Sequence, residues 1–160
     1  MSTPNRLIGP SAKFFEDFKV GDRIVTQGRT VTQADGLFWS MFSGDMNPMH
    51  VDYDYAKRHG IYGTAFPAGL VVVAIASGLL ERTGFSAGTG LAIIEQTVRY
   101  KTPVLFGETI HLELEITELR PSRNNPRGTV CFKYQVIKTD GVVSVEGEWT
   151  WLFASRASVG

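Results

Sequence analysis

The chain has 160 residues, of which 43% are hydrophobic and 20% are charged, and its 16 cationic and 16 acidic residues give a formal net charge of zero. This composition is typical of one compact domain and excludes a disordered chain. The zero net charge gives no support to nucleic acid or an anionic membrane as a partner.

The first 14 residues are expected to form a flexible leader before a single domain at residues 15–156. The stretch "MSTPNRLIGPSAK" lacks the apolar core of a secretory signal. The longest mostly apolar run, residues 65–80, contains Pro67 and Gly69 and is shorter than the roughly 20 residues of a membrane span. The lone Cys131 is expected to be a buried, reduced thiol, which favours a cytoplasmic protein.

The first elements are a strand and an amphipathic helix. Residues 22–32 are rich in β-branched side chains and predict a strand with a break at Gly28. Thr32 followed by Asp35 is a helix N-cap signal, and Ser43 with Gly44 should end that helix. The apolar residues that recur at helical spacing between them are Leu37, Phe38, Met41 and Phe42.

The stretch "SGDMNPMH" at residues 43–50 follows this helix. It fits neither the alternation of a strand nor the interior of a helix, because Pro48 interrupts it. It therefore predicts an irregular turn that gathers the side chains of Asp45, Asn47 and His50. A short helix over residues 52–60 should follow, capped by Asp52.

The second half of the chain predicts one buried helix and then a sheet. Residues 69–82 are apolar on nearly every face, so this helix should be surrounded by core. Four strands are expected at residues 89–104, 108–120, 128–140 and 142–154, the last two joined by a hairpin at Asp140-Gly141. The predicted class is α+β, with a curved antiparallel sheet wrapped around a central helix.

This element order resembles the hotdog fold, and two segments narrow the resemblance. "FSGDMNPMHVDYDYA" followed by "FPAGLVVVAIASGLL" resembles the hydratase motif of the MaoC-like dehydratases, the (R)-specific enoyl-CoA hydratases. "VRYKTPVLFGETI" is also similar to the pattern of that family. The similarity covers roughly residues 15–155, and its most specific part is Gly-Asp-x-Asn-Pro-x-His.

The resemblance implies an acyl-CoA enzyme. It implies reversible addition of water to a trans-2-enoyl thioester, without metal or cofactor, in a homodimer whose sheets join edge to edge around a substrate tunnel. Asp45 and His50 match the catalytic pair, and Gly69 matches the glycine whose backbone N–H polarises the thioester carbonyl. The residues matching the family's substrate-binding positions are Asn47, Ser77, Ala68 and Leu70, with Ala68 standing where the family often has histidine.

The chemistry explains this choice of residues. A carboxylate and a neutral imidazole, each about 3 Å from one water, can hold that water and take its proton. Negative charge then develops on the thioester oxygen, and the free amides at a helix N-terminus can stabilise it. Asp45 and His50 are expected to supply the first device and Gly69 the second, with glycine allowing close approach.

Other readings remain open at this point. Asp45 and Asn47 could be ordinary turn residues, and Ser77 could bond only to the carbonyl four residues before it. A metal site from this segment fits neither the EF-hand nor the zinc-helix spacing, so Asp52, Asp54 and His59 should instead cap helices and face solvent. His111 is expected to be structural, and Glu95 could face either the tunnel or an edge of the sheet.

Two further functions and one further contact also stay open. The chain could be a hotdog acyl-CoA thioesterase, with a differently placed carboxylate aiming water at the carbonyl carbon, or a non-catalytic acyl-thioester-binding subunit. Arg120, Arg123 and Arg127 could form a solvated loop or hold the CoA phosphates, because arginine suits phosphate geometry.

Overall fold

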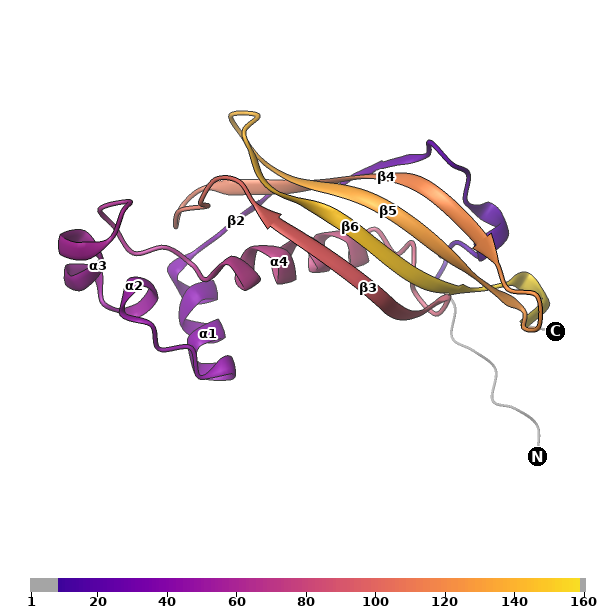
Figure 1. The fold of residues 1–160 in the computed structure, drawn as a ribbon, viewed down its shortest axis with the longest axis horizontal. Coiled ribbons are helices and arrows are strands. Elements are labelled where there is room, and N and C mark those ends of the chain that lie inside the picture. Colours follow the sequence, from indigo (N-terminus) through magenta and orange to yellow (C-terminus); the bar gives the residue numbers. More distant parts are fainter. Residues whose placement is uncertain (1–8, 159–160) are drawn as a thin grey trace.

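An antiparallel sheet curves around one long helix in the computed structural model, which describes residues 9–158 (Figure 1). Within these residues the strand order is β1-β4-β5-β6-β3, and β2 also pairs with β4. The strands are β1 (Arg23–Val25), β2 (Arg29–Thr30), β3 (Gly90–Tyr100), β4 (Thr109–Pro121), β5 (Arg127–Lys138) and β6 (Val143–Ala154). The helices are α1 (Gln33–Ser43), α2 (Pro48–Val51), α3 (Tyr53–His59) and α4 (Gly69–Glu81), with 3-10 turns at Phe15–Asp17 and Arg156–Ser158.

The core lies between α4 and one face of the sheet, as the alternating sequence predicted. On β4, Ile110 and Leu112 are fully buried, while His111 and Glu113, which alternate with them, are only partly covered. On α4, Val72, Ala76 and Leu80 are among the residues that join the same buried cluster. Removing these side chains from water stabilises the fold by roughly 25 cal/mol per Å² of apolar surface. The α+β hotdog arrangement is therefore confirmed.

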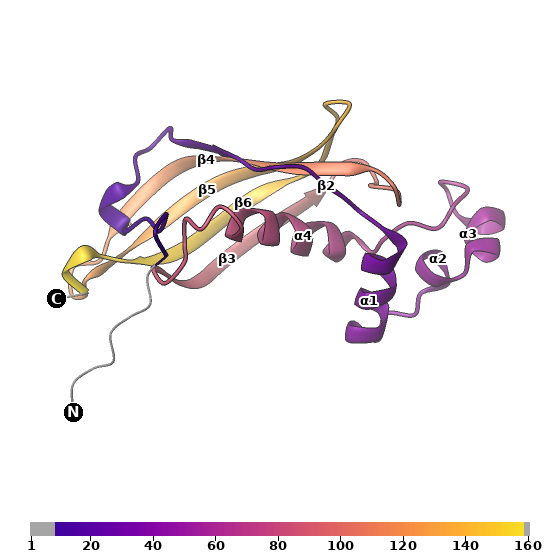
Figure 2. The same cartoon turned by 180° about the vertical axis from the view of Figure 1, so that it is seen from behind.

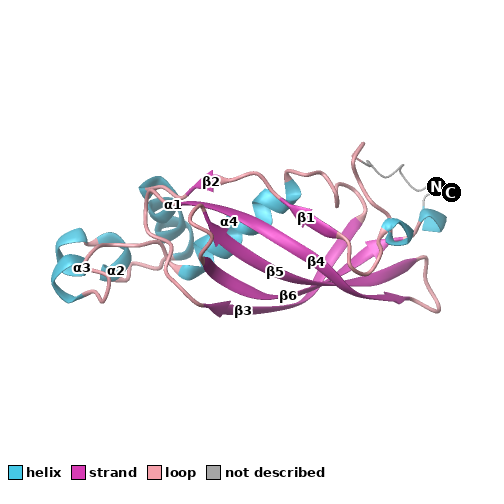
Figure 3. Ribbon diagram, turned by 90° about the horizontal axis from the view of Figure 1, so that it is seen from above, coloured by secondary structure: helices cyan, strands magenta, loops and turns pink. Residues whose placement is uncertain are grey.

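Helices α1, α2 and α3 extend past one end of the sheet (Figures 1 and 3). The predicted N-cap Thr32 begins α1 with a capping box, in which the Asp35 amide donates to the Thr32 hydroxyl and the Thr32 amide donates to the Asp35 carboxylate. Gly44 ends the helix with a φ of 79°, which glycine adopts without strain. The chain therefore leaves α1 at a defined angle, directly before Asp45.

The segment after α1 differs from the predicted irregular turn. Only Gly44 to Asn47 is irregular, and a one-turn helix, α2, begins at Pro48. Proline is tolerated there because the first residue of a helix needs no N–H and its φ is already helical. The prediction was wrong for residues 48–50, because it took Pro48 to exclude a helix and did not consider proline as the first residue of one.

Two further predictions concern Cys131 and the leader. Cys131 is half-buried rather than buried, because it points to the outer face of β5 between the core residues Val130 and Phe132. Residues 1–8 of the predicted leader lie outside the described residues. In the part that follows, the Gly9 amide donates to the Ala87 carbonyl and the Lys13 amide to the Phe85 carbonyl.

No helix in the described part of the chain is long and apolar enough to cross a membrane. The cytoplasmic location stays a prediction.

Candidate active site at the start of helix α4

His50 is tied to the peptide that leads into α4. Its Nδ1 atom lies 2.8 Å from the backbone carbonyl oxygen of Phe66. A carbonyl oxygen can only accept, so Nδ1 must carry the hydrogen and donate it. In the neutral ring, Nε2 is then an acceptor. The ring also meets the Phe66 ring edge-on, with centroids 5.1 Å apart, so its orientation is held from two sides.

Asp45 occupies the irregular turn between α1 and α2. Its amide donates to the Ser43 hydroxyl at 3.2 Å, and its Oδ1 accepts from the Asn47 amide at 3.3 Å. Its Oδ2 has no hydrogen-bond partner within residues 9–158. No direct hydrogen bond or ion pair joins Asp45 to His50 in that part of the chain. Asp45 therefore keeps an unused acceptor oxygen.

Asn47 organises the turn that carries His50. It is the N-cap of α2, and its side-chain oxygen accepts from the Met49 amide at 3.0 Å. The His50 amide donates to the Asn47 backbone carbonyl at 2.8 Å. These bonds fix the path from Asn47 to His50, so Asn47 supports the turn through its cap.

The first turn of α4 presents free backbone donors. Its N-cap is Ala68, which has no side chain that could accept a hydrogen bond, and the first amide bonded back to it is that of Val71. Within residues 9–158, the amides of Gly69 and Leu70 have no acceptor. Because unpaired N–H groups and the helix dipole give this end a partial positive charge, it favours a developing anion.

Tyr100, the last residue of β3, is a neighbour that sequence reasoning missed. A Cβ atom placed on Gly69 would lie 2.6 Å from Cε1 and 2.8 Å from Cζ of Tyr100, closer than real Cβ contacts allow. Glycine was expected here so that substrate could approach the backbone. In the structure, what approaches Gly69 so closely is the tyrosine ring.

The hydroxyl of Ser77 is half-buried on α4. The expected alternative was a bond from this hydroxyl to the carbonyl four residues before it. No such bond forms, and the hydroxyl has no partner among the described residues. Ser77 is therefore available for a ligand that reaches the middle of α4.

A groove of about 490 Å³ lies between α1 and α4. Its apolar walls include Phe38, Phe42 and Ile75, and Arg82 lies at its edge. Phe38 and Phe42 are stacked on each other and are 71% and 76% exposed. Leu70, in the first turn of α4, is also largely exposed. The exposed side of α4 is therefore apolar.

The other polar residues of the segment have structural contacts. Asp52 caps α3 through the Tyr55 amide, Asp54 pairs with Arg58, and His59 packs on the Tyr55 ring, as expected of solvated capping residues. No three His, Cys, Asp or Glu side chains in residues 9–158 are grouped so that they could hold a metal ion.

The remaining polar candidates lie on β3 and β4. On the outer face of β4, the Nε2 atom of His111 lies 3.2 Å from Oε1 of Glu113. The structural role of His111 stays a prediction. Glu95 is exposed on β3. Of the three arginines, Arg120 pairs with Glu118. The β4–β5 turn that carries Arg123 lies at the end of the sheet away from α1–α3 (Figures 1 and 2).

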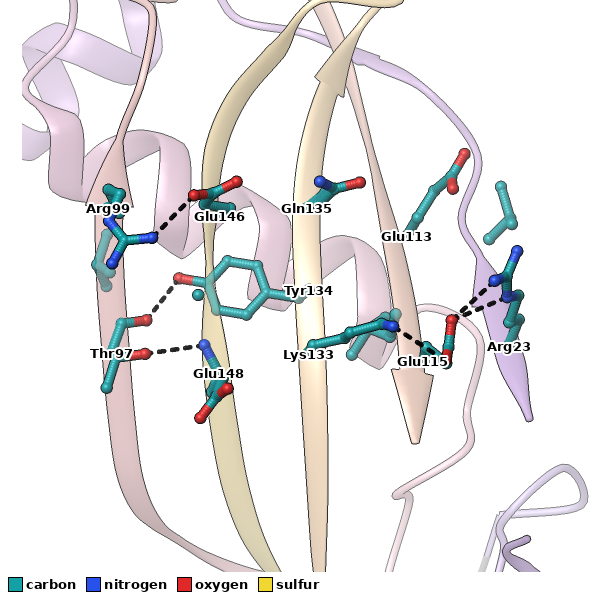
Figure 4. Close-up of a pocket in the computed structure, with 14 residues that line it drawn as sticks. Arg23, Thr97, Arg99, Glu113, Glu115, Lys133, Tyr134, Gln135, Glu146 and Glu148 are labelled. Atoms are coloured by element: carbon teal, nitrogen blue, oxygen red, sulfur yellow. Dashed lines mark hydrogen bonds and ion pairs between the residues drawn. The ribbon is translucent and has the colours of Figure 1, made fainter. Parts of the chain in front are cut away.

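A second cavity, of about 780 Å³, lies on the outer face of the sheet and contains none of the predicted site residues. Three basic side chains line it, and each pairs with a glutamate on an adjacent strand: Arg99 with Glu146, and both Arg23 and Lys133 with Glu115 (Figure 4). Because these basic side chains are already paired and none of the predicted site residues lies here, we place the candidate active site at α4 instead.

Comparisons with known proteins agree with the fold described above. A family described as MaoC like domain matches residues 17–137. The 3-hydroxybutyryl-CoA dehydratase of Methylorubrum extorquens is 29% identical over 83% of this chain and 83% of its own length. The (R)-specific enoyl-CoA hydratase of Rhodospirillum rubrum is 28% identical over 89% of this chain and 93% of its own.

Solved structures give the same result. The MaoC-like dehydratase from Rhodospirillum rubrum superimposes with a TM-score of 0.76 at 27% identity, covering 90% of this chain and 98% of that one. A protein from Archaeoglobus described as a monoamine oxidase regulatory protein superimposes with a TM-score of 0.84 at 25% identity, covering 93% of this chain and 99% of that one.

Proposed function

The chain belongs to the MaoC-like domain family, and from this we propose that it is a hydro-lyase that hydrates a trans-2-enoyl-CoA to an (R)-3-hydroxyacyl-CoA, or catalyses the reverse dehydration. Relatives named as a 3-hydroxybutyryl-CoA dehydratase and an (R)-specific enoyl-CoA hydratase support this reaction class. The observation that carries the proposal is the bond between His50 Nδ1 and the Phe66 carbonyl.

That bond supports His50 as the base. With Nδ1–H donated to Phe66, the neutral imidazole offers Nε2 to a water molecule. The free Oδ2 of Asp45 is the second acceptor proposed for the same water. The two groups come from one short segment held by the α1 C-cap and the Asn47 N-cap, so they are held in place before substrate binds.

The start of α4 is proposed to stabilise the negative charge that develops during the reaction. As the water oxygen bonds to C3, the C2–C3 double-bond electrons move toward the carbonyl oxygen of the thioester. The free amides of Gly69 and Leu70 are proposed to stabilise that oxygen. Losing one such donor typically costs about 100- to 1,000-fold in rate.

The last step returns a proton to C2. His50 takes one proton from the water as its oxygen adds to C3, and that proton is then delivered to C2 while the carbonyl re-forms. The sum is the addition of H and OH across the double bond, with the thioester kept intact. We propose that Ala68, Leu70 and Ser77 line the acyl chain, since Ala68 is the N-cap of α4, Leu70 lies in its first turn and Ser77 lies further along the same helix.

A second copy of the chain is proposed to complete the site. Within residues 9–158, β3 pairs only with β6, which leaves its other edge open, and Leu91, Ile93 and Ile94 on this strand are 40%, 50% and 58% exposed. An open apolar edge strand of 11 residues is unusual in a chain that acts alone. Joining two such edges would cover this surface in a homodimer.

One assay tests the reaction and separates its rivals. The purified protein is given a panel of trans-2-enoyl-CoA substrates of different chain lengths, and enoyl absorbance and free thiol are followed together. A hydratase removes the enoyl absorbance without releasing thiol, and chiral analysis should give the (R) product. Thiol release would indicate a thioesterase, and binding without either change would indicate a non-catalytic acyl-thioester-binding subunit.

A further inference from the structure

Tyr100 lies against the first residue of α4 although the two are far apart in sequence. Its Cε1 and Cζ atoms lie 2.6 and 2.8 Å from where a Cβ on Gly69 would stand. The hydroxyl oxygen is bonded to Cζ, so it also lies beside the start of the helix. Apart from the helix itself, the three atoms nearest to that position all belong to the Tyr100 ring.

The fold fixes this placement rather than leaving it to a flexible loop. β3 runs back along α4, so its last residue reaches the end of the molecule where α4 begins (Figures 1 and 2). Tyr100 pairs with Val145 of β6, and the next amide, that of Lys101, donates to the Ser144 carbonyl at 2.9 Å. The backbone of Tyr100 is therefore held by the sheet.

The hydroxyl of Tyr100 is unused. It has no hydrogen-bond partner within residues 9–158, and the residue is 51% exposed. Tyr134 on β5 offers a contrast, because its hydroxyl donates to the Thr97 carbonyl at 3.1 Å. Partial burial raises the pKa of Tyr100, so its hydroxyl stays protonated and can donate.

We propose that Tyr100 is a further catalytic residue, whose hydroxyl donates a hydrogen bond to the thioester carbonyl oxygen next to the amides of Gly69 and Leu70. This inference rests on the proposed hydration. It gives the developing oxyanion a side-chain donor in addition to the backbone donors, in a geometry where glycine at 69 is required so that the ring can lie against the helix.

The test compares Tyr100→Phe with the wild type and with Tyr55→Phe, a matched removal of a hydroxyl from an exposed tyrosine of α3. Phenylalanine keeps the ring against Gly69, so the melting temperature should not change. We expect kcat for enoyl-CoA hydration to fall about 100-fold or more, with a small change in KM, because the bond strengthens as charge develops. Tyr55→Phe should retain wild-type kcat.

A second measurement does not depend on turnover. Butyryl-CoA labelled with ¹³C at the thioester carbonyl cannot react, and its carbonyl stretching frequency is compared free and bound by difference infrared spectroscopy. A hydrogen bond from Tyr100 lowers the frequency of the bound carbonyl in the wild type, and part of that shift should be lost in Tyr100→Phe but kept in Tyr55→Phe. If the Tyr100 ring has only a structural role, the frequency of the bound carbonyl should be the same in Tyr100→Phe as in the wild type.

The outcomes separate this inference from the proposed function. If the wild type hydrates enoyl-CoA and Tyr100→Phe keeps kcat within about threefold with the same carbonyl frequency, Tyr100 is not a donor while the hydratase assignment stands. If the wild type turns over no substrate, the hydratase assignment fails. The difference in carbonyl frequency between the wild type and Tyr100→Phe then tests by itself whether Tyr100 donates to the thioester carbonyl. A wild-type protein that shifts no carbonyl overturns the inference.

Discussion

The Nδ1 atom of His50 lies 2.8 Å from the backbone carbonyl oxygen of Phe66, three residues before α4 begins. This contact joins the one-turn helix α2 to the segment that leads into α4, whose first amides are the proposed oxyanion donors. It also selects one tautomer, because a carbonyl oxygen cannot donate. The proposed base and the proposed oxyanion site are thus positioned by the same short stretch of backbone.

Replacing His50 by alanine should lower kcat at least about 100-fold, which is the usual contribution of a positioned general base. The fold should change little because the side chain is only half-buried. Steady-state kinetics and a thermal melt measure the two effects. His59→Ala is the control, since His59 is exposed on α3 and its ring contacts that of Tyr55. Near-normal turnover in His50→Ala would remove it from the mechanism.

Replacing Asp45 by asparagine should also lower kcat at least about 100-fold. Asparagine keeps an Oδ1 acceptor for the Asn47 amide, so the turn should persist while the negative charge and one acceptor oxygen are lost. Circular dichroism checks the fold and enoyl-CoA hydration checks the rate. Asp54→Asn, on the exposed face of α3, is the matched control. An active Asp45→Asn variant would make Asp45 a turn residue only.

Replacing Asn47 by alanine should reduce the free energy of unfolding by about 1 kcal/mol, the usual cost of losing a helix cap. The lost bond is the one that the Met49 amide donates to the Asn47 side chain. Turnover should fall as well, because α2 carries His50. Asn47→Asp retains an acceptor and should recover both in denaturant titrations and kinetics. Equal losses in the two variants would show that Asn47 acts other than as a cap.

The parts of the fold that sequence predicted are those set by local chemistry. The capping box of Thr32 and Asp35, the C-cap Gly44 and the buried helix from Gly69 depend on residues within a few positions of one another. The alternation along β4 likewise assigns its two faces without knowledge of any other strand. The segment containing Asp45, Asn47 and His50 was found in the same way, from its short spacing.

The contacts that sequence could not predict join distant segments. Nothing in the residues around Gly69 indicates that the Tyr100 ring lies against it, because the return of β3 along α4 creates that contact. The bond from His50 to Phe66 also requires the loop between them to fold back. Pro48 was misread for a local reason, since its effect depends on whether it starts a helix or interrupts one.

Replacing Gly69 by alanine should destabilise the protein and abolish most turnover. The new Cβ would stand 2.6 Å from Cε1 of Tyr100, so the ring must move away from the start of α4. Adding Tyr100→Leu should relieve the clash and raise the melting temperature of Gly69→Ala, while activity stays low because the tyrosine hydroxyl is also gone. If Tyr100→Leu restores no stability to Gly69→Ala, the clash is not the cause of the loss.

Replacing Ile94 by glutamate should weaken the proposed homodimer. Ile94 is 58% exposed on β3, the strand whose outer edge is open, and buried charges without partners are costly at an interface. Sedimentation velocity should show a shift toward monomer, with a parallel loss of turnover if the second copy completes the site. Val25→Glu is the control, because Val25 is 63% exposed on β1, the strand at the opposite edge of the sheet. A monomeric, active wild type would refute the dimer.

Replacing Asp35 by asparagine should change how stability depends on pH. Burial tends to raise the pKa of Asp35, but the hydrogen bonds from the Thr32 amide and hydroxyl, together with Arg29, outweigh it and lower that pKa below its ordinary value. A group with a lowered folded-state pKa stabilises the fold above its unfolded-state pKa of about 3.9, and this stabilisation is lost as the pH falls through the folded-state value.

Near neutral pH, Asp35→Asn should therefore be less stable than the wild type by about 1 kcal/mol, the net size of a typical hydrogen bond. The difference should shrink as the pH falls below about 4, because the wild-type carboxylate becomes protonated and resembles the neutral amide. Urea titrations from about pH 7 to about pH 3 measure both curves. A difference that stays constant over this range would mean that the charge of Asp35 does not stabilise the start of α1, and that asparagine acts there only through altered packing.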